Sequence, residues 1–163
     1  AMFRPNHRIV YFFSFITIAF LAITSTPALL AQSTVAATSN DYSGPLRIAK
    51  LLWKGNAKNA ASTLRNTIHT ALDRGDVVNL VKALPPLKEL ATSLVESGET
   101  QDPRYGVAIA IVLAVDSHAE VLSDLPKLIA ASEGLSDREL VWRVWLQVDR
   151  PQAFAELEKI LAS

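Results

Sequence analysis

The chain contains no cysteine, and this absence removes several chemistries at once. A chain without cysteine has no disulfide to stabilise it and no thiol nucleophile. It also has no lipid anchor on an N-terminal cysteine and no haem attached through a CxxCH motif. Histidine is scarce too, with three in the chain, one of them His7 near the N-terminus. Two further histidines without cysteine are too few for a His-rich zinc site. We therefore predict no metal and no cofactor.

Sequence motifs for nucleotide binding and hydrolysis are also missing, including GxGxxG, GxxxxGK[ST], HExxH and GxSxG. Asp116, Ser117 and His118 have the residue types of a catalytic triad, but adjacent side chains point in different directions and should not converge on one atom. A turn capped by Asp116 or Ser117 explains the tripeptide better. We predict no catalytic residues. The alternative is a small enzyme, or an enzyme-associated domain, with an unrecognised site that uses His118 or Asp116.

The first 31 residues have the composition of a secretory signal peptide. Basic residues precede an uncharged apolar run from Ile9 to Ile23, and small residues follow it. The run is shorter than the roughly 20 residues that span a bilayer comfortably. We predict cleavage after Ala31, with Ala28 and Ala36 as alternatives, and export to the periplasm or cell envelope of a bacterium. An uncleaved leader that tethers the protein to the membrane is the competing interpretation.

Neither sign of charge is in excess, because the chain has 16 basic and 16 acidic residues. Because the leader carries Arg4 and Arg8, its removal leaves 14 basic residues against 16 acidic ones. So little net charge provides no basic footprint for nucleic acid, which we exclude as a partner. About 130 residues then remain, enough for one domain with its own core. Small and polar residues over 32–44 predict a flexible linker, and residues 45–163 the domain.

Helical periodicity dominates the chain after the linker. Gly75 and Asp76 predict the end of one helix and the start of another, and Pro85-Pro86 breaks the second. The earlier stretch LRIAKLLW, residues 46–53, is amphipathic and is either a half-repeat or a docking helix. The apolar face over 57–72 follows the spacing of an α-helix and consists of Ala57, Ala60, Ala61, Leu64, Ile68, Ala71 and Leu72.

The last third of the chain contains an internal repeat. VAIAIVLAVD, residues 107–116, matches LVWRVWLQVD, residues 140–149, at an offset of 33. Taken alone, the apolar run over 107–115 fits a buried strand as well as a buried helix. In the second copy Glu139, Arg143 and Gln147 form one polar stripe at helical spacing, with Glu139 and Arg143 as an expected ion pair. The repeat extends this interpretation to the first copy. We predict an all-α protein.

Residues 137–162, DRELVWRVWLQVDRPQAFAELEKILA, resemble the bacterial HEAT-like repeat of the phycobilisome-lyase type. Trp142, Trp145 and Gln147 depart from the pattern, standing where the family usually has small residues. The resemblance implies a short α-solenoid of six or seven helices, stacked as antiparallel hairpins in a right-handed superhelix. Such arrays usually bind or scaffold other proteins. The residues that fit the family pattern are Asp137, Val141, Leu146, Asp149, Pro151, Ala153, Leu157 and Leu161.

Candidate partner-binding residues follow from this architecture. We predict that Trp145 packs in the core and that Trp142, with Arg138 nearby, offers an aromatic contact to another protein at the end of the array. Capping of the array's own end is the alternative role for Trp142. The second helices should line a concave face with charged residues, namely Glu120, Lys127, Glu156 and Lys159.

Overall fold

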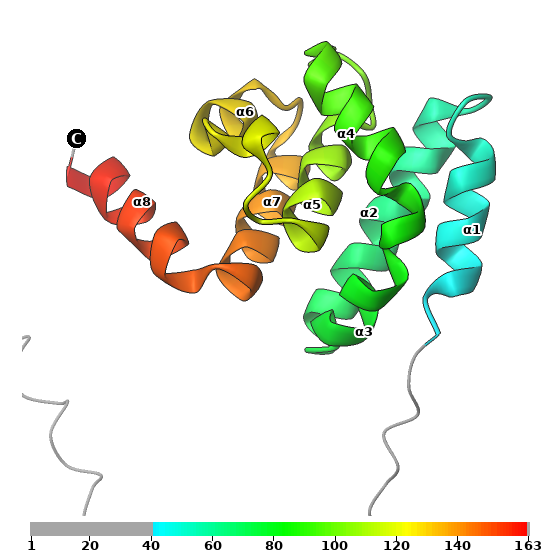
Figure 1. The fold of residues 1–163 in the computed structure, drawn as a ribbon, viewed down its shortest axis with the longest axis horizontal. Helices are drawn as coiled ribbons and strands as arrows, with labels where there is room; N and C mark the ends of the chain where they lie inside the picture. Colours follow the sequence, from blue (N-terminus) through cyan, green and yellow to red (C-terminus); the bar gives the residue numbers. More distant parts are fainter. Residues whose placement is uncertain (1–40, 163) are drawn as a thin grey trace, which may run out of the picture. The chain divides into compact units, whose positions relative to one another are not determined.

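The structure is a computed structural model that describes residues 41–162, and this part of the chain is all-helical (Figure 1). The all-α prediction is confirmed, since residues 41–162 contain no β-strand. The expected six or seven helices is too low a number, because the same range holds eight α-helices and two short 3₁₀ helices. The described residues belong to one compact unit. In chain order the helices are α1 (Ser43–Leu52), α2 (Ala57–Asp73), α3 (Val77–Ala83), η1 (Pro85–Leu87), α4 (Lys88–Ser97), α5 (Tyr105–Val115), η2 (Glu120–Leu122), α6 (Leu125–Ala131), α7 (Leu135–Val148) and α8 (Arg150–Ala162).

Helix α1 begins before the end of the predicted linker. Ser43 and Gly44 are helical and Tyr42 is buried, so the linker expected over 32–44 is too long at its C-terminal end. The Tyr42 hydroxyl donates a hydrogen bond to Asp76 Oδ2 at 3.1 Å, which ties the start of α1 to the turn between α2 and α3. The predicted leader and residues 32–40 lie outside the described residues.

Local chemistry explains where the helices of the N-terminal half start and stop. The side chain of Asn56 accepts a hydrogen bond from the backbone N–H of Asn59 at 3.2 Å and caps the start of α2. Gly75 has a φ of 67°, a left-handed conformation that glycine adopts without strain, and it follows the end of α2 as predicted. Asp76 occupies the N-cap position of α3, but its carboxylate accepts from the side chains of Asn79 and Tyr42 and does not cap the α3 backbone.

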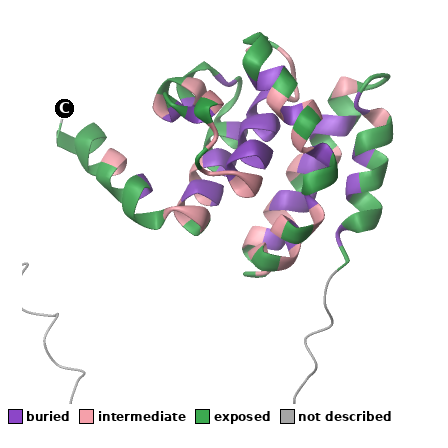
Figure 2. Ribbon diagram, in the orientation of Figure 1, coloured by how far each residue is buried: buried purple, intermediate pink, exposed green. Residues whose placement is uncertain are grey.

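Helix α5 lies at the centre of the core (Figure 2). Nine consecutive residues, Tyr105 to Leu113, are buried, and α5 packs between α4 and α7. A helix that is apolar all round is expected where neighbours enclose it on every side. The repeat therefore predicts the correct structure for the ambiguous run over 107–115.

Helices α5 and α7 approach each other closely at Gly106. A Cβ atom at this position would lie 2.5 Å from the Cβ of Asp137, so only glycine fits. Asp137 is 5% exposed, and its two oxygens accept hydrogen bonds from Nε and Nη2 of Arg65 at 2.5 and 2.9 Å. Hydrogen bonding to Asp137 raises the pKa of Arg65. The paired donors satisfy a buried charge and join α2 to α7.

A second polar contact between α2 and α7 corrects the predicted pairing of Arg143. Its Nη2 donates to Asp73 Oδ1 at 2.5 Å and its Nη1 contacts His69 Nδ1 at 3.1 Å, so the expected pair with Glu139 does not form. The hydrogen bond from Arg143 lowers the pKa of Asp73. A partner on a neighbouring helix replaces the partner one turn away because α2 packs directly against this face of α7.

Candidate functional site

A cleft of about 340 Å³ lies between α8 and the segment that joins α5 to α6. We call it the C-terminal cleft. Two residues predicted for a concave face, Glu156 and Lys159, line it from α8, and the buried Trp145 contributes from α7. The lysine Nζ lies 2.9 Å from Oε2 of the glutamate, so these two residues pair with each other. The cleft therefore has polar walls whose charges are already partly compensated.

The remaining predicted charges of the concave face do not line this cleft. Lys127 is exposed on α6, and its Nζ lies 2.5 Å from Oδ2 of Asp124, which does line the cleft. Hydrogen bonding to this aspartate raises the pKa of Lys127. Glu120 is exposed at the start of η2 and is absent from the lining. The structure thus brings together two of the four charged residues in the cleft lining, while Lys127 borders the cleft through Asp124 and Glu120 lies outside the lining.

The two tryptophans of α7 stack on each other, with ring centroids 5.0 Å apart and an angle of 26° between the ring planes. Trp145 is buried in the core, as predicted, and Trp142 is half-buried. Arg138 is exposed and forms two hydrogen bonds within the chain. It donates from Nε and Nη2 to the carbonyl oxygens of Ser132 and Ala130 at 3.2 and 3.0 Å, at the C-terminal end of α6. A role for Trp142 in partner binding stays a prediction.

The Asp116–Ser117–His118 turn differs in one respect from expectation. Ser117 Oγ and His118 Nδ1 lie 3.2 Å apart, so two of these adjacent side chains do meet. Asp116, however, accepts from the backbone N–H of His118 at 3.3 Å and pairs with Lys88 at 3.2 Å. That hydrogen bond from Lys88 lowers the pKa of Asp116. The aspartate stabilises the turn after α5 and does not orient the imidazole ring, so the arrangement lacks the third member of a triad.

Helix α8 is exposed along most of its length (Figure 2), and its exposed residues include large apolar ones. Phe154, Leu157 and Leu161 follow helical spacing on one side of α8, and we call this the α8 face. Phe154 is 51% exposed and Leu161 is 86% exposed. Ala153 is the only residue of α8 that is buried, and α8 packs on α7. The chain therefore leaves most of the apolar surface of this helix accessible.

A longer groove runs along α1, between this helix and the η1–α4 segment. Three cavities of about 580, 470 and 380 Å³ follow one another along it. The first two share Arg47, Lys50 and Pro86 in their linings, and the last two share Trp53 and Leu90. We call this feature the α1 groove. Helix α1 packs on α2, and the residues that line the groove come from α1 on one side and mainly from η1 and α4 on the other.

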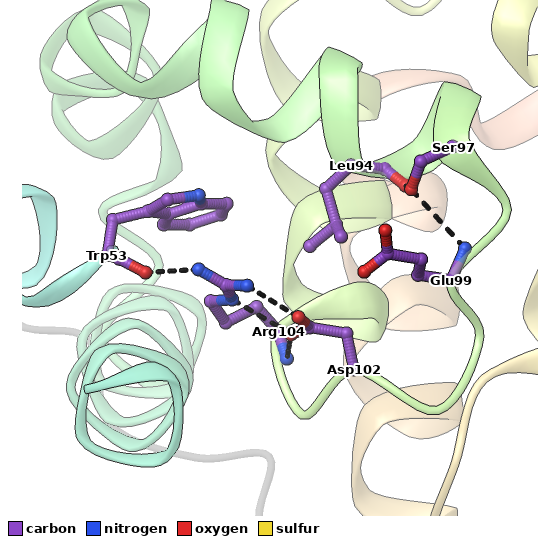
Figure 3. Close-up of polar contacts among 6 residues, drawn as sticks. All are labelled: Trp53, Leu94, Ser97, Glu99, Asp102 and Arg104. Carbon is purple, nitrogen blue, oxygen red and sulfur yellow. Dashed lines mark hydrogen bonds and ion pairs between the residues drawn. The ribbon is translucent and has the colours of Figure 1, made fainter. Parts of the chain in front are cut away.

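Arg104 connects the far end of the α1 groove to the core helix α5 (Figure 3). Its guanidinium donates to the carbonyl oxygen of Trp53 and lies over the indole ring, with Cζ 5.1 Å from the ring centroid. Asp102 accepts from Nε and Nη2 of this arginine at 2.8 and 2.5 Å. The hydrogen bond from Arg104 lowers the pKa of Asp102 and raises that of the arginine. One side chain thus holds both the loop before α5 and the C-terminal end of α1.

Sequence reasoning identified the helix of this groove but not the groove. Arg47 and Lys50 on α1 and Lys54 just after its end recur at spacings of three and four, and this spacing is visible in the sequence as a sign of one basic side. The contact between Arg104 and Trp53 spans 51 positions. No local sequence pattern predicts a contact between residues so far apart in the chain.

The comparisons with known proteins add no assignment to this geometry. Among residues 41–162, no three His, Asp or Glu side chains gather in a way that could hold a metal ion. In the same range, no helix combines the length and the apolar character needed to cross a membrane. No protein-family model, no curated protein and no solved structure matches the chain.

Proposed function

We propose that this protein is an exported binding module or scaffold that recognises another protein through a helical-repeat surface. The α8 face is the observation that carries the proposal. Leu161 is 86% exposed and Phe154 is 51% exposed. Burial of a leucine or phenylalanine side chain contributes about 1.5–3 kcal/mol, so two such residues on one face favour association with a partner.

The order of helix packing supports a HEAT-like stack as the architecture. Helices α5 and α7, which carry the two copies of the internal repeat, pack against each other. In a stack, the first helices of successive repeats lie side by side in this way, and α6 and α8 then serve as the second helices. A following repeat would pack at the end occupied by α8. We place the partner on the α8 face.

The C-terminal cleft adds polar recognition beside this apolar face. Glu156 and Lys159 lie on the same helix as Phe154 and Leu161, and they line the cleft. A partner that covers the α8 face would meet polar groups at its border. An apolar centre with a polar rim is typical of protein interfaces.

Site-specific photo-crosslinking in the native host tests the proposal. A benzophenone amino acid is placed in the full-length protein at Leu161 or Phe154 and, as the control, at the exposed Ser62 on α2. We expect a discrete crosslinked protein from the two α8 positions and none from position 62. Identical adducts at all three positions, or no adduct at the α8 positions, contradict the proposal.

Export is tested separately by N-terminal sequencing of the protein purified from its host. A mature N-terminus near Gln32 supports cleavage of the leader and release into the periplasm or envelope. An N-terminus at Met2 supports a membrane-tethered subunit. The partner proposed for the α8 face is compatible with either result.

A further inference from the structure

We infer that the α1 groove binds an amphipathic helix of a partner protein, with acidic residues on the edge of that helix that faces α1. This surface lies on other elements than the α8 face. Binding at either surface can therefore be lost without the other.

The floor of the groove is apolar. Leu46, Trp53 and Leu87 are buried and line it, and Leu51 is 77% exposed on the α1 side. An apolar floor between two helices takes up the ridge that leucine-type residues form at positions i, i+3, i+4 and i+7 of an amphipathic helix. Helix α1 has 10 residues and is about 15 Å long, so the groove accommodates about three turns of such a helix.

The α1 wall of the groove is basic. Arg47 and Lys50 on α1 and Lys54 just after its end line it, and α1 itself contains no acidic residue; Asp41, before the start of α1, lines the first cavity. None of the three forms an ion pair within residues 41–162. Their charges are therefore available to an occupant, and carboxylates on its facing edge would complement them.

The opposite wall carries the opposite charge. Glu89 on α4 lines the same cavity as Lys50 and Lys54, yet no ion pair crosses the groove in the described part of the chain. A helix whose second edge carries a lysine or arginine complements Glu89. A flat anionic membrane would meet this carboxylate unfavourably and could not reach the buried floor between the walls.

Two contacts hold α1 at its ends and so fix the width of the groove before binding. The Tyr42 hydroxyl binds Asp76 at the start of α1, and Arg104 binds the Trp53 carbonyl just after its end. A groove that is already open and held at both ends loses little conformational entropy on binding.

The leader of the chain itself does not complement this groove. Residues 1–40 contain no aspartate or glutamate and include Arg4 and Arg8. A segment with basic charge alone cannot neutralise Arg47, Lys50 and Lys54. Charge therefore favours a different protein chain as the occupant.

Fluorescence anisotropy with a labelled synthetic peptide tests the inference on the full-length protein. The probe is an 18-residue amphipathic helix with a leucine ridge, glutamates on one edge and lysines on the other. The control peptide keeps the leucines and has lysines on both edges. We expect the probe to bind at least about tenfold more tightly than the control peptide at low salt, a preference that weakens as salt screens the charges.

Variants of the protein locate the binding. Arg47→Glu, Lys50→Glu and Lys54→Glu together should weaken probe binding by at least about tenfold. The matched control, Lys58→Glu with Lys82→Glu, reverses exposed lysines outside the groove and should leave binding unchanged. Lys50→Gln with Lys54→Gln is a milder variant in case circular dichroism shows that the triple variant has lost its helices.

Three results would overturn the inference. They are absence of probe binding, equal binding by the groove and control variants, and charge-dependent binding to phosphatidylglycerol vesicles without binding to the probe. Removal of residues 1–31 from the chain adds a further arm. If probe binding appears only after this removal, the leader occupies the groove and the partner assignment is wrong. Crosslinking at Leu161 tests the α8 face and does not depend on the α1 groove. Each of the two proposals can therefore be contradicted without the other.

Discussion

Helices α5 and α8 have similar lengths but opposite environments. Helix α5 has 11 residues, of which nine in succession are buried, whereas α8 has 13 residues and buries one (Figure 2). Both contain leucine, isoleucine and alanine. Helix α5 is enclosed by α4 and α7, whereas α8 packs mainly on α7. The sequences of the two helices match these environments, because α5 has no charged residue, whereas α8 carries Arg150, Glu156, Glu158 and Lys159.

This contrast separates the part of the molecule that stabilises the fold from the part that is available for binding. The region around α5 and α7 combines apolar burial with a buried ion pair and a close helix approach. Helix α8 contributes little to that core and exposes its apolar residues. Substitutions near α5 should therefore reduce the free energy of unfolding, and substitutions on α8 should affect association.

The largest effect is expected from Arg65→Met at the junction of α2 and α7. This change leaves the carboxylate of Asp137 buried without its partner, which should reduce the free energy of unfolding by about 3 kcal/mol. Urea denaturation measures the loss. Adding Asp137→Asn removes the unpaired charge at nearly the same volume and should recover part of it. A single variant as stable as the wild type would show that solvent reaches Asp137.

Gly106→Ala should cause the next largest change in the free energy of unfolding, and two opposing effects decide the sign of that change. Alanine favours a helix over glycine by about 1 kcal/mol. The added Cβ would lie 2.5 Å from the Cβ of Asp137, and overpacking of this kind costs about 1–3 kcal/mol, so we expect a net loss of stability. Gly44→Ala in α1 is the matched control, because no atom lies within 4 Å of its added Cβ. If both variants are equally stable, α5 and α7 are less closely packed than the structure has them.

The close approach at Gly106 illustrates what the sequence could and could not predict. Periodicity and the internal repeat predict helices over 57–72 and 107–115, because the buried residues of a helix recur at a regular spacing in the sequence. The helix boundaries at Gly75 and Pro85-Pro86 followed from backbone restrictions of single residues. Contacts between helices that are distant in the sequence produce no such spacing. The sequence therefore predicts Glu139 as the partner of Arg143, whereas in the structure Arg143 binds Asp73.

The candidate sites show the same limit. The basic side of α1 was readable from the spacing of Arg47, Lys50 and Lys54, but the groove depends on where α4 lies relative to α1. Among the residues predicted for partner binding, Arg138 binds backbone carbonyls at the end of α6, an interaction that has no sequence pattern. A charged residue is easy to recognise in a sequence, but its partner is determined by the tertiary packing.

A smaller and pH-dependent effect is expected where the α5 region connects to α1, through Asp102 and Arg104. The pKa of Asp102 is lower in the folded protein than in the unfolded chain, where it is about 3.9. The pair therefore contributes stability that is present above pH 4 and is lost as the pH falls through the lower folded value. Asp102→Asn should reduce the free energy of unfolding at pH 7 by about 1–2 kcal/mol, with a difference that shrinks towards pH 2.

The control for this pH dependence is Asp116→Asn. The pair of Asp116 with Lys88 is more exposed, with side chains 39% and 43% exposed, so its removal should change stability less at every pH. Urea denaturation between pH 7 and pH 2 compares the two variants with the wild type. A difference for Asp102→Asn that stays constant over this range would mean that the pair with Arg104 does not favour the charged carboxylate.

The smallest effect on stability is expected from Leu161→Ala on the α8 face. The same substitution at Leu113, which is 1% exposed in α5, should cost about 3 kcal/mol, whereas Leu161 is 86% exposed and should cost less than about 0.5 kcal/mol. Urea denaturation at two protein concentrations measures both variants. A large loss at Leu161 would show that the α8 face is covered in solution. If that loss also grew with protein concentration, a second copy of the chain would be the cover, because association stabilises the folded state by mass action.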